Sequence, residues 1–106
     1  MAYKVLGQVA LAATTATTLY TVPSGKSAVV STICICNRAA TDTTFRIAIR
    51  PAGATLATLH YIAYDVTVGG ADTTNLTIGI TLAATDVVTV YAGNANLSVS
   101  LFGSEI

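Results

Sequence analysis

The chain carries very little charge. Only 9% of its 106 residues are Asp, Glu, Lys or Arg, and the five basic and five acidic side chains cancel to a formal net charge of zero. Soluble domains carry roughly 25% charged residues, so this surface is expected to be adhesive. The basic residues form no run, whereas phosphate binding requires clustered Lys and Arg. We therefore expect no nucleic acid among its partners.

Long apolar runs are also missing, although apolar residues make up 53% of the chain. No window holds the roughly 18 apolar residues of a membrane-spanning helix, so no membrane partner is expected. The start, "MAYKVLGQVALAATT", is interrupted at Gly7 and Gln8. Its alternation predicts a strand, with a signal peptide as the weaker alternative. A length of 106 residues suits one core, so residues 1–106 are treated as a single domain.

Helical periodicity is nearly absent, and runs of β-branched residues in steps of two take its place. In "TTFRIAIRP", Phe45, Ile47 and Ile49 fall on one face, and Pro51 then ends the strand. The segment "TNLTIGITLAA" alternates in the same way but places Gly79 on its polar face, which suggests a bend or a close approach there. In "NLSVSLF" the alternate Leu and Val residues are predicted to point inward.

Counting such segments gives about eight strands joined by short turns. The sequence therefore predicts an all-β fold, a single antiparallel β-sandwich of jelly-roll type. An immunoglobulin-type sandwich is the alternative, but there is no Trp and no widely spaced cysteine pair to support it. Thr and Ser are the commonest residues on the polar faces of the predicted strands. Either they are there because of their β propensity, or another subunit covers these faces. Exposed sheet edges and low charge together predict a homo-oligomer.

Cysteine occurs twice, at Cys34 and Cys36 within "VVSTICICNR". One intervening residue is too few for the usual zinc spacing, and with His60 the pair offers three ligands where structural zinc sites use four. A disulfide is disfavoured because positions two apart on a strand lie roughly 6.6 Å apart with parallel side chains. We expect a central strand covered on both faces, one face comprising Val30, Thr32, Cys34 and Cys36 and the other Val29, Ser31, Ile33 and Ile35.

No catalytic constellation is expected, and neither a metal nor a cofactor. A Cys–His nucleophile would need Cys34 or Cys36 beside His60, but a thiol in mid-strand lacks the setting that lowers its pKa. His60 is therefore interpreted as structural or as part of an interface, although a small hydrolase using these residues stays open. The aspartates at 42, 65, 72 and 86 each lie beside a predicted turn, where aspartate binds its own backbone.

Five tyrosines could form a sugar-binding or protein-binding patch, because a half-buried ring offers contact area and a polar tip. In so β-rich a chain, most are expected to pack against the sheets. They are Tyr3, Tyr20, Tyr61, Tyr64 and Tyr91.

Three blocks covering nearly the whole chain carry a resemblance to a known group. These are "LYTVPSGKSAVVSTICICNRAATDTTFRIAIRP", "HYIAYDVTVGGADTTNLTIGITLAATDVVTVYAG" and the closing "LFGSEI". They resemble small virion proteins of tailed bacteriophages, notably phages of cyanobacteria and other aquatic bacteria. The resemblance implies a non-enzymatic capsid decoration or cement protein that stabilises the shell. A tail, neck or fibre protein binding a host-surface glycan or receptor is the alternative.

The implied partners are the major capsid protein and other copies of the chain, as a homotrimer or a dimer. The implied location is the virion, and assembly in the host cytoplasm would keep the thiols reduced. For the interface we predict the two ends of the chain, because termini can join neighbouring subunits at little folding cost. The predicted interface residues are Tyr3, Lys4, Phe102, Gly103, Ser104, Glu105 and Ile106.

Overall fold

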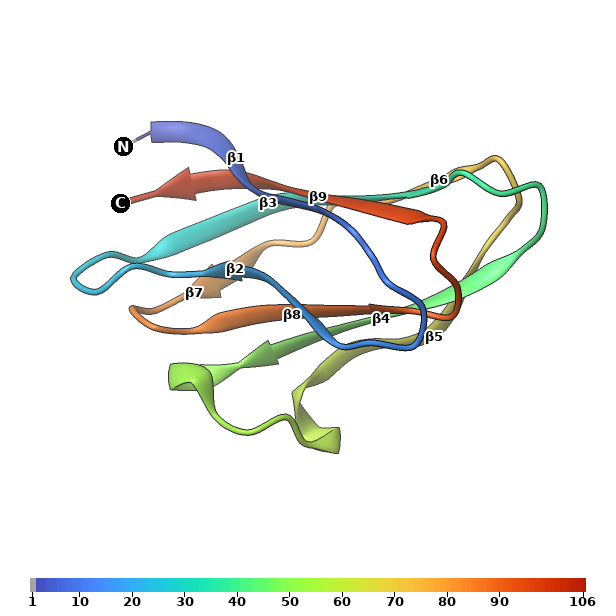
Figure 1. The fold of residues 1–106 in the computed structure, drawn as a ribbon. Helices are drawn as coiled ribbons and strands as arrows, with labels where there is room; N and C mark the ends of the chain where they lie inside the picture. The colour runs from blue at the N-terminus through green and yellow to red at the C-terminus, as the bar shows by residue number, and fades with distance from the viewer. Residues whose placement is uncertain (1) are drawn as a thin grey trace.

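Two antiparallel β-sheets packed face to face form the fold (Figure 1), which the computed structural model describes over residues 2–106. The first sheet has the order β1–β9–β3–β6, with β7 also paired to β3. Its strands are β1 (Ala2–Ala10), β9 (Leu97–Glu105), β3 (Ala28–Asn37), β6 (Thr73–Leu76) and β7 (Ile80–Leu82). The second sheet comprises β2 (Thr17–Thr21), β8 (Val87–Ala92), β4 (Thr43–Arg50) and β5 (Tyr61–Val68), in that order.

The strand order is that of a jelly roll, which confirms the predicted fold class. Successive strands change sheets, except at the β4–β5 hairpin and at the β6–β7 break. Both β6 and β7 pair with β3, so together they act as one interrupted strand. The predicted strand "TNLTIGITLAA" is therefore divided into two, and the structure has nine strands where about eight were predicted. Gly79 lies at the break between β6 and β7, and a Cβ atom there would meet nothing within 4 Å, so the glycine is not a close approach.

The core lies between the two sheets and is built from their alternating inward side chains. Phe45 and Ile47 of β4 are buried as predicted, and so are Leu97, Val99 and Leu101 of β9. Burying one such side chain contributes about 1.5–3 kcal/mol, so these alternating rows hold the sheets together. The largest fully buried residues also include Ile33, Ile35, Val22, Val30, Val68, Val88 and Val90.

Strand β3 is central in its sheet, between β9 and the β6–β7 pair, as predicted. A bulge shifts its register, because Val30 pairs with Gly103 whereas Thr32 pairs with Phe102. The extra residue reverses which positions point inward. Val30 is consequently buried together with Ile33 and Ile35, so its predicted placement on the face of the cysteines is wrong.

In the described residues, the helical content consists of two 3-10 turns, at Pro51–Gly53 and Thr58–His60, on the connection from β4 to β5. Within residues 2–106 no helix is long and apolar enough to cross a membrane.

Candidate functional site

The outer face of the first sheet carries no charged side chain among the residues that the structure describes. Residues directly opposite each other on antiparallel strands point to the same side, so the pairing register gives this face row by row. The rows are Tyr3–Ser104–Val29–Thr81, Val5–Phe102–Thr32, Gln8–Ser100–Cys34–Asn75 and Ala10–Ser98–Cys36–Thr73. We call these residues the uncharged face.

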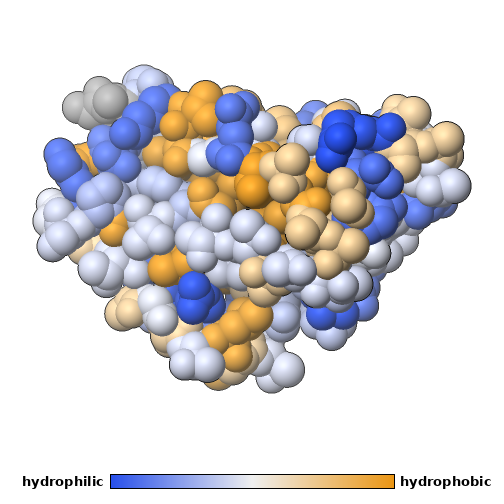
Figure 2. Space-filling model, viewed as in Figure 1, coloured by the Kyte–Doolittle hydropathy of each residue, from blue (hydrophilic) through white to orange (hydrophobic). Residues whose placement is uncertain are grey.

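One end of the uncharged face is apolar. Tyr3 is 83% exposed, and Val5 and Val29 are also exposed. In Figure 2, apolar side chains reach the surface along β1, at the top of the view. Between Tyr3 and Val29 lies Ser104, whose hydroxyl is buried without a hydrogen-bond partner among the described residues. An exposed apolar end of this kind is typical of a surface that another molecule covers.

The structure brings the predicted interface residues to this end of the molecule, but not all to one face. Tyr3, Phe102 and Ser104 lie on the uncharged face, whereas Lys4 and Gly103 pair with each other on the opposite side of the sheet. Glu105 also points away from the uncharged face, because its carboxylate accepts a hydrogen bond from Tyr20 of the second sheet.

The C-terminal residues expected at an interface belong to the first sheet and do not form a separate tail. Residues 102–105 continue β9, which lies between β1 and β3. The main chain of Ile106 also exchanges hydrogen bonds with that of Ser27, of 2.8 and 3.1 Å. The alternation that predicts β9 continues past Leu101, so the C-terminus is part of the sheet.

Glu105 is held by two partners at this end of the sandwich. The Tyr20 hydroxyl donates to Oε2 at 2.6 Å, and Lys4 Nζ lies 3.2 Å from Oε1. The hydrogen bond from Tyr20, followed by that from Lys4, lowers the pKa of the Glu105 carboxyl below its usual 4.5. Burial, with the hydrogen bond to Glu105 second, raises the pKa of Tyr20. Two of the predicted interface residues are thus committed to bonds within the chain.

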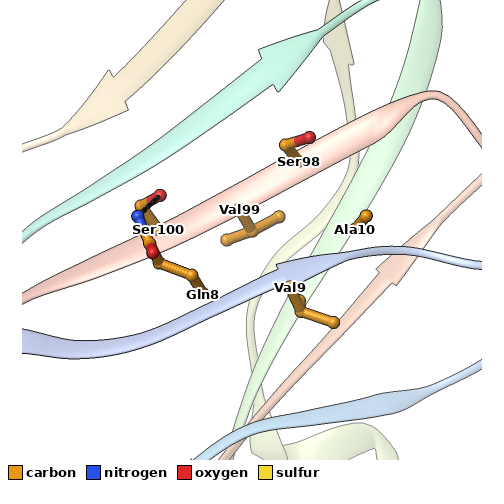
Figure 3. A pocket seen from close by; sticks show the side chains of 6 residues that line it. All are labelled: Gln8, Val9, Ala10, Ser98, Val99 and Ser100. Atoms are coloured by element: carbon orange, nitrogen blue, oxygen red, sulfur yellow. Dashed lines mark hydrogen bonds between the residues drawn. The ribbon is translucent and has the colours of Figure 1, made fainter.

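A hollow of about 290 Å³ lies where β1 meets β9 (Figure 3). It is lined by Gln8, Val9, Ala10, Ser98, Val99 and Ser100. Figure 3 shows the side chains of Gln8 and Ser100 turned toward each other, with Gln8 Nε2 donating to Ser100 Oγ at 3.2 Å. The small side chains of Ala10 and Ser98 leave room beside this pair. With an amide, hydroxyls and no titratable group, the hollow can accept a neutral polar side chain of a docked partner.

Cys34 and Cys36 lie in the middle of the uncharged face as half-exposed, free thiols. Among residues 2–106, nothing supplies the expected cover over this side of β3. His60 lies elsewhere, buried at the end of the second 3-10 turn, where its Nδ1 accepts a hydrogen bond from the Ala57 N–H at 3.0 Å. The structure does not bring the thiols and His60 together. In the described part of the chain, no three His, Cys, Asp or Glu residues gather closely enough to hold a metal ion.

Asp72 and Asp86 bind backbone N–H groups of their own turns, as predicted, whereas Asp42 binds one that is distant in the sequence. Asp42 accepts from Gly70 at 3.0 Å, Asp72 from Thr73 at 2.8 Å, and Asp86 from both Ala52 and Ala83 at 2.9 Å. Asp65 differs, because its carboxylate binds the side chain of Arg46.

The tyrosines divide between the two sheets. Tyr20 is buried, which confirms the packing prediction for that residue, and Tyr3 lies on the uncharged face. Tyr64 and Tyr91 each contact Arg46 of the second sheet, and Tyr61 packs against Tyr64. The periodicity of the sequence does not reveal this cluster, because it depends on the pairing of β4, β5 and β8.

No protein-family model, curated protein sequence or solved structure matches this chain.

Proposed function

We propose that this protein is a structural component of a bacteriophage virion, a capsid decoration or cement protein. Its uncharged face binds the shell formed by the major capsid protein. The uncharged face carries this proposal, because covering it removes no ionic group from water. Its apolar end gains roughly 25 cal/mol for each Å² of apolar surface that is covered. The resemblance of the sequence to small phage virion proteins supports the same role.

Contacts between copies of the chain complete the proposed function. Strand β5 is an edge of the second sheet, and Ile62 and Val66 are exposed along it. Apolar side chains on a sheet edge favour association with another subunit. A homotrimer or dimer on a symmetry axis of the shell would repeat the uncharged face and multiply its contacts. Assembly in the host cytoplasm, followed by residence in the virion, fits two free thiols.

Particles with and without the protein test the proposal. We expect particles that lack it to lose their DNA at a lower temperature, and the purified protein to bind to them and restore stability. Equal thermal and osmotic stability of the two particles would contradict the cement role.

Charge substitutions test which face binds. Ser98→Glu with Ser100→Glu places two carboxylates on the uncharged face and should abolish binding to particles. Thr18→Glu with Thr21→Glu is the matched control, because both threonines are exposed on β2 of the second sheet. Circular dichroism verifies that both variants fold. If the pair on β2 abolished binding and the pair on β9 did not, the uncharged face would not be the contact surface.

A further inference from the structure

A second surface lies on the opposite side of the sandwich, where Arg46 of β4 is enclosed by aromatic rings. The guanidinium carbon lies 4.2 Å from the centroid of Tyr64 and 4.3 Å from that of Tyr91. Tyr61 adds a third ring, edge-to-face with Tyr64 at 4.9 Å. Strands β4, β5 and β8, which supply these residues, lie side by side in Figure 1. We call Arg46, Tyr61, Tyr64, Asp65 and Tyr91 the tyrosine cluster.

Irregularities in β5 build the tyrosine cluster. The pairing of β5 with β4 shifts between Phe45 and Ile47 and again between Ile47 and Ala48. Asp65 lies in the first shift with a φ of 51°, in the left-handed region. Such strain costs of order 1–3 kcal/mol and is found mainly where surrounding contacts or a function maintain it. Here it aims the Asp65 carboxylate at Arg46, with contacts of 2.6 and 3.3 Å.

The charges of Arg46 and Asp65 cancel, which limits the kinds of ligand that the tyrosine cluster can bind. Asp65 neutralises Arg46, and the hydrogen bond from Arg46 lowers the pKa of the Asp65 carboxyl, so the pair stays ionised near neutral pH. An anionic ligand such as a phosphate would have to compete with this internal carboxylate. A nucleic acid would also need basic residues around the rings.

The exposed groups of the cluster match the chemistry of a sugar. Tyr64 is 55% exposed, and the side chain of Asp65 is 46% exposed. A guanidinium has five N–H donors, so the two contacts with Asp65 leave donors available, and a carboxylate accepts several hydrogen bonds. A tyrosine ring offers rigid apolar area with a polar tip. A pyranose combines an apolar C–H face with a rim of hydroxyls, and it therefore fits a ring bordered by fixed donors and acceptors.

We propose that the tyrosine cluster is a binding site for neutral, hexose-containing glycans. The C–H face of one pyranose stacks on the face of the Tyr64 ring opposite the Arg46 guanidinium, while its hydroxyls bind the exposed Asp65 carboxylate. This site is separate from the uncharged face and does not depend on the proposed capsid role. On a particle held through the uncharged face, the tyrosine cluster would lie on the opposite side of the sandwich and could bind glycans outside the shell.

Titration of the isotope-labelled protein with hexamers of glucose, mannose and galactose tests the site by amide NMR. We expect at least one hexamer to shift the amides of Arg46, Tyr64 and Tyr91 at millimolar concentration. Tyr64→Ala should weaken that binding about tenfold, which corresponds to about 1.4 kcal/mol. Tyr64→Phe keeps the ring and should bind within about threefold of the natural chain, which separates the stacking from the hydroxyl.

Tyr3→Ala is the matched control, because Tyr3 is even more exposed but lies on the other sheet. It should leave glycan binding unchanged. The proposal is overturned if none of the three hexamers shifts these amides at 10 mM, a concentration well above the millimolar affinity expected of one weak contact. It is also overturned if Tyr3→Ala weakens binding as much as Tyr64→Ala, or if dextran sulfate binds this cluster more tightly than every neutral hexamer. Failure here would leave the binding of the protein to particles unaffected.

Discussion

Gly103 occupies a position in β9 where only a residue without a side chain fits. A Cβ atom there would lie 2.1 Å from the carbonyl oxygen of Val29, a backbone atom held by the pairing of β3 with β9. We expect Gly103→Ala to destabilise the fold by about 2 kcal/mol or more, in the range of overpacking substitutions. Chemical denaturation measures this loss.

Gly79→Ala is the control for that prediction. Nothing lies within 4 Å of a Cβ atom at this position, and Gly79 is not among the glycines with positive φ. The substitution should be neutral or should stabilise by up to about 1 kcal/mol, because alanine restricts the unfolded chain. If both alanine variants unfolded at the same denaturant concentration, close approach at Gly103 would not explain its presence.

The Glu105 carboxylate should make stability depend on pH. Its pKa is lower in the folded protein than the usual 4.5, because Tyr20 and Lys4 hydrogen-bond to the ionised form. A carboxyl whose pKa is lower in the folded protein than in the unfolded chain stabilises the fold at pH values above its unfolded pKa. This stabilisation is lost as the pH falls through its folded pKa. The natural chain should therefore be more stable than Glu105→Gln at pH 7, and the difference should shrink below pH 4.5.

Urea unfolding of the natural chain and Glu105→Gln, repeated from pH 7 down to pH 3, provides the measurement. Asp65 also titrates with a lowered pKa, but it is present in both proteins and cancels in the difference. A difference in stability that stays constant across the series would mean that ionisation of Glu105 contributes nothing.

At the scale of strands, the sequence pattern predicts which segments form the sheets but not where the pairing slips. Phe45, Ile47 and the inward residues of β9 follow simple alternation, so their burial is predictable. The bulge between Val30 and Thr32 is not, because it arises from the pairing of two strands far apart in the sequence. One extra residue reverses every inward position beyond it, which is why Val30 is misplaced by alternation alone.

The left-handed conformation at Asp65 gives a prediction about strand β5. Replacing Asp65 by either glycine or alanine removes the carboxylate, so comparing these two variants isolates the backbone. Asp65→Gly should be more stable than Asp65→Ala by roughly 1 kcal/mol, because a φ of 51° strains a residue that has a Cβ. Thermal unfolding monitored by circular dichroism provides the comparison.

Thr67 of the same strand serves as the control, since it is not among the residues with positive φ. There the order should reverse, with Thr67→Ala more stable than Thr67→Gly. If alanine were the more stable substitution at both positions, the chain would not hold Asp65 in the left-handed region.

At the scale of the whole molecule, both proposed surfaces depend on the register in which the strands pair. Most of their residues therefore cannot be grouped from the sequence alone. Low charge indicates an adhesive surface, but only the pairing of β1, β9 and β3 shows that one complete face lacks charge. The two ends of the chain lie together because β1 pairs with β9, yet Lys4 and Glu105 of the expected interface point away from the uncharged face. Arg46 and Asp65, 19 residues apart, meet through the irregular pairing of β4 with β5.

The two thiols on the uncharged face can show directly whether that face binds the shell. Cys34 and Cys36 are half-exposed in the separate chain, so both should react with a maleimide in the purified protein. Docking through the uncharged face would place them inside a contact from which water is excluded. Their labelling on intact particles should therefore be slower by about tenfold or more.

A thiol on the other sheet provides the comparison. Thr18→Cys, made in a chain with both natural cysteines replaced by serine, places one thiol at an exposed position of β2. Its labelling rate should stay within about twofold between free protein and particles, because the interface does not cover it. Equal labelling of Cys34 and Cys36 in both states, or protection of the β2 thiol alone, would mean that the protein meets the particle through another surface.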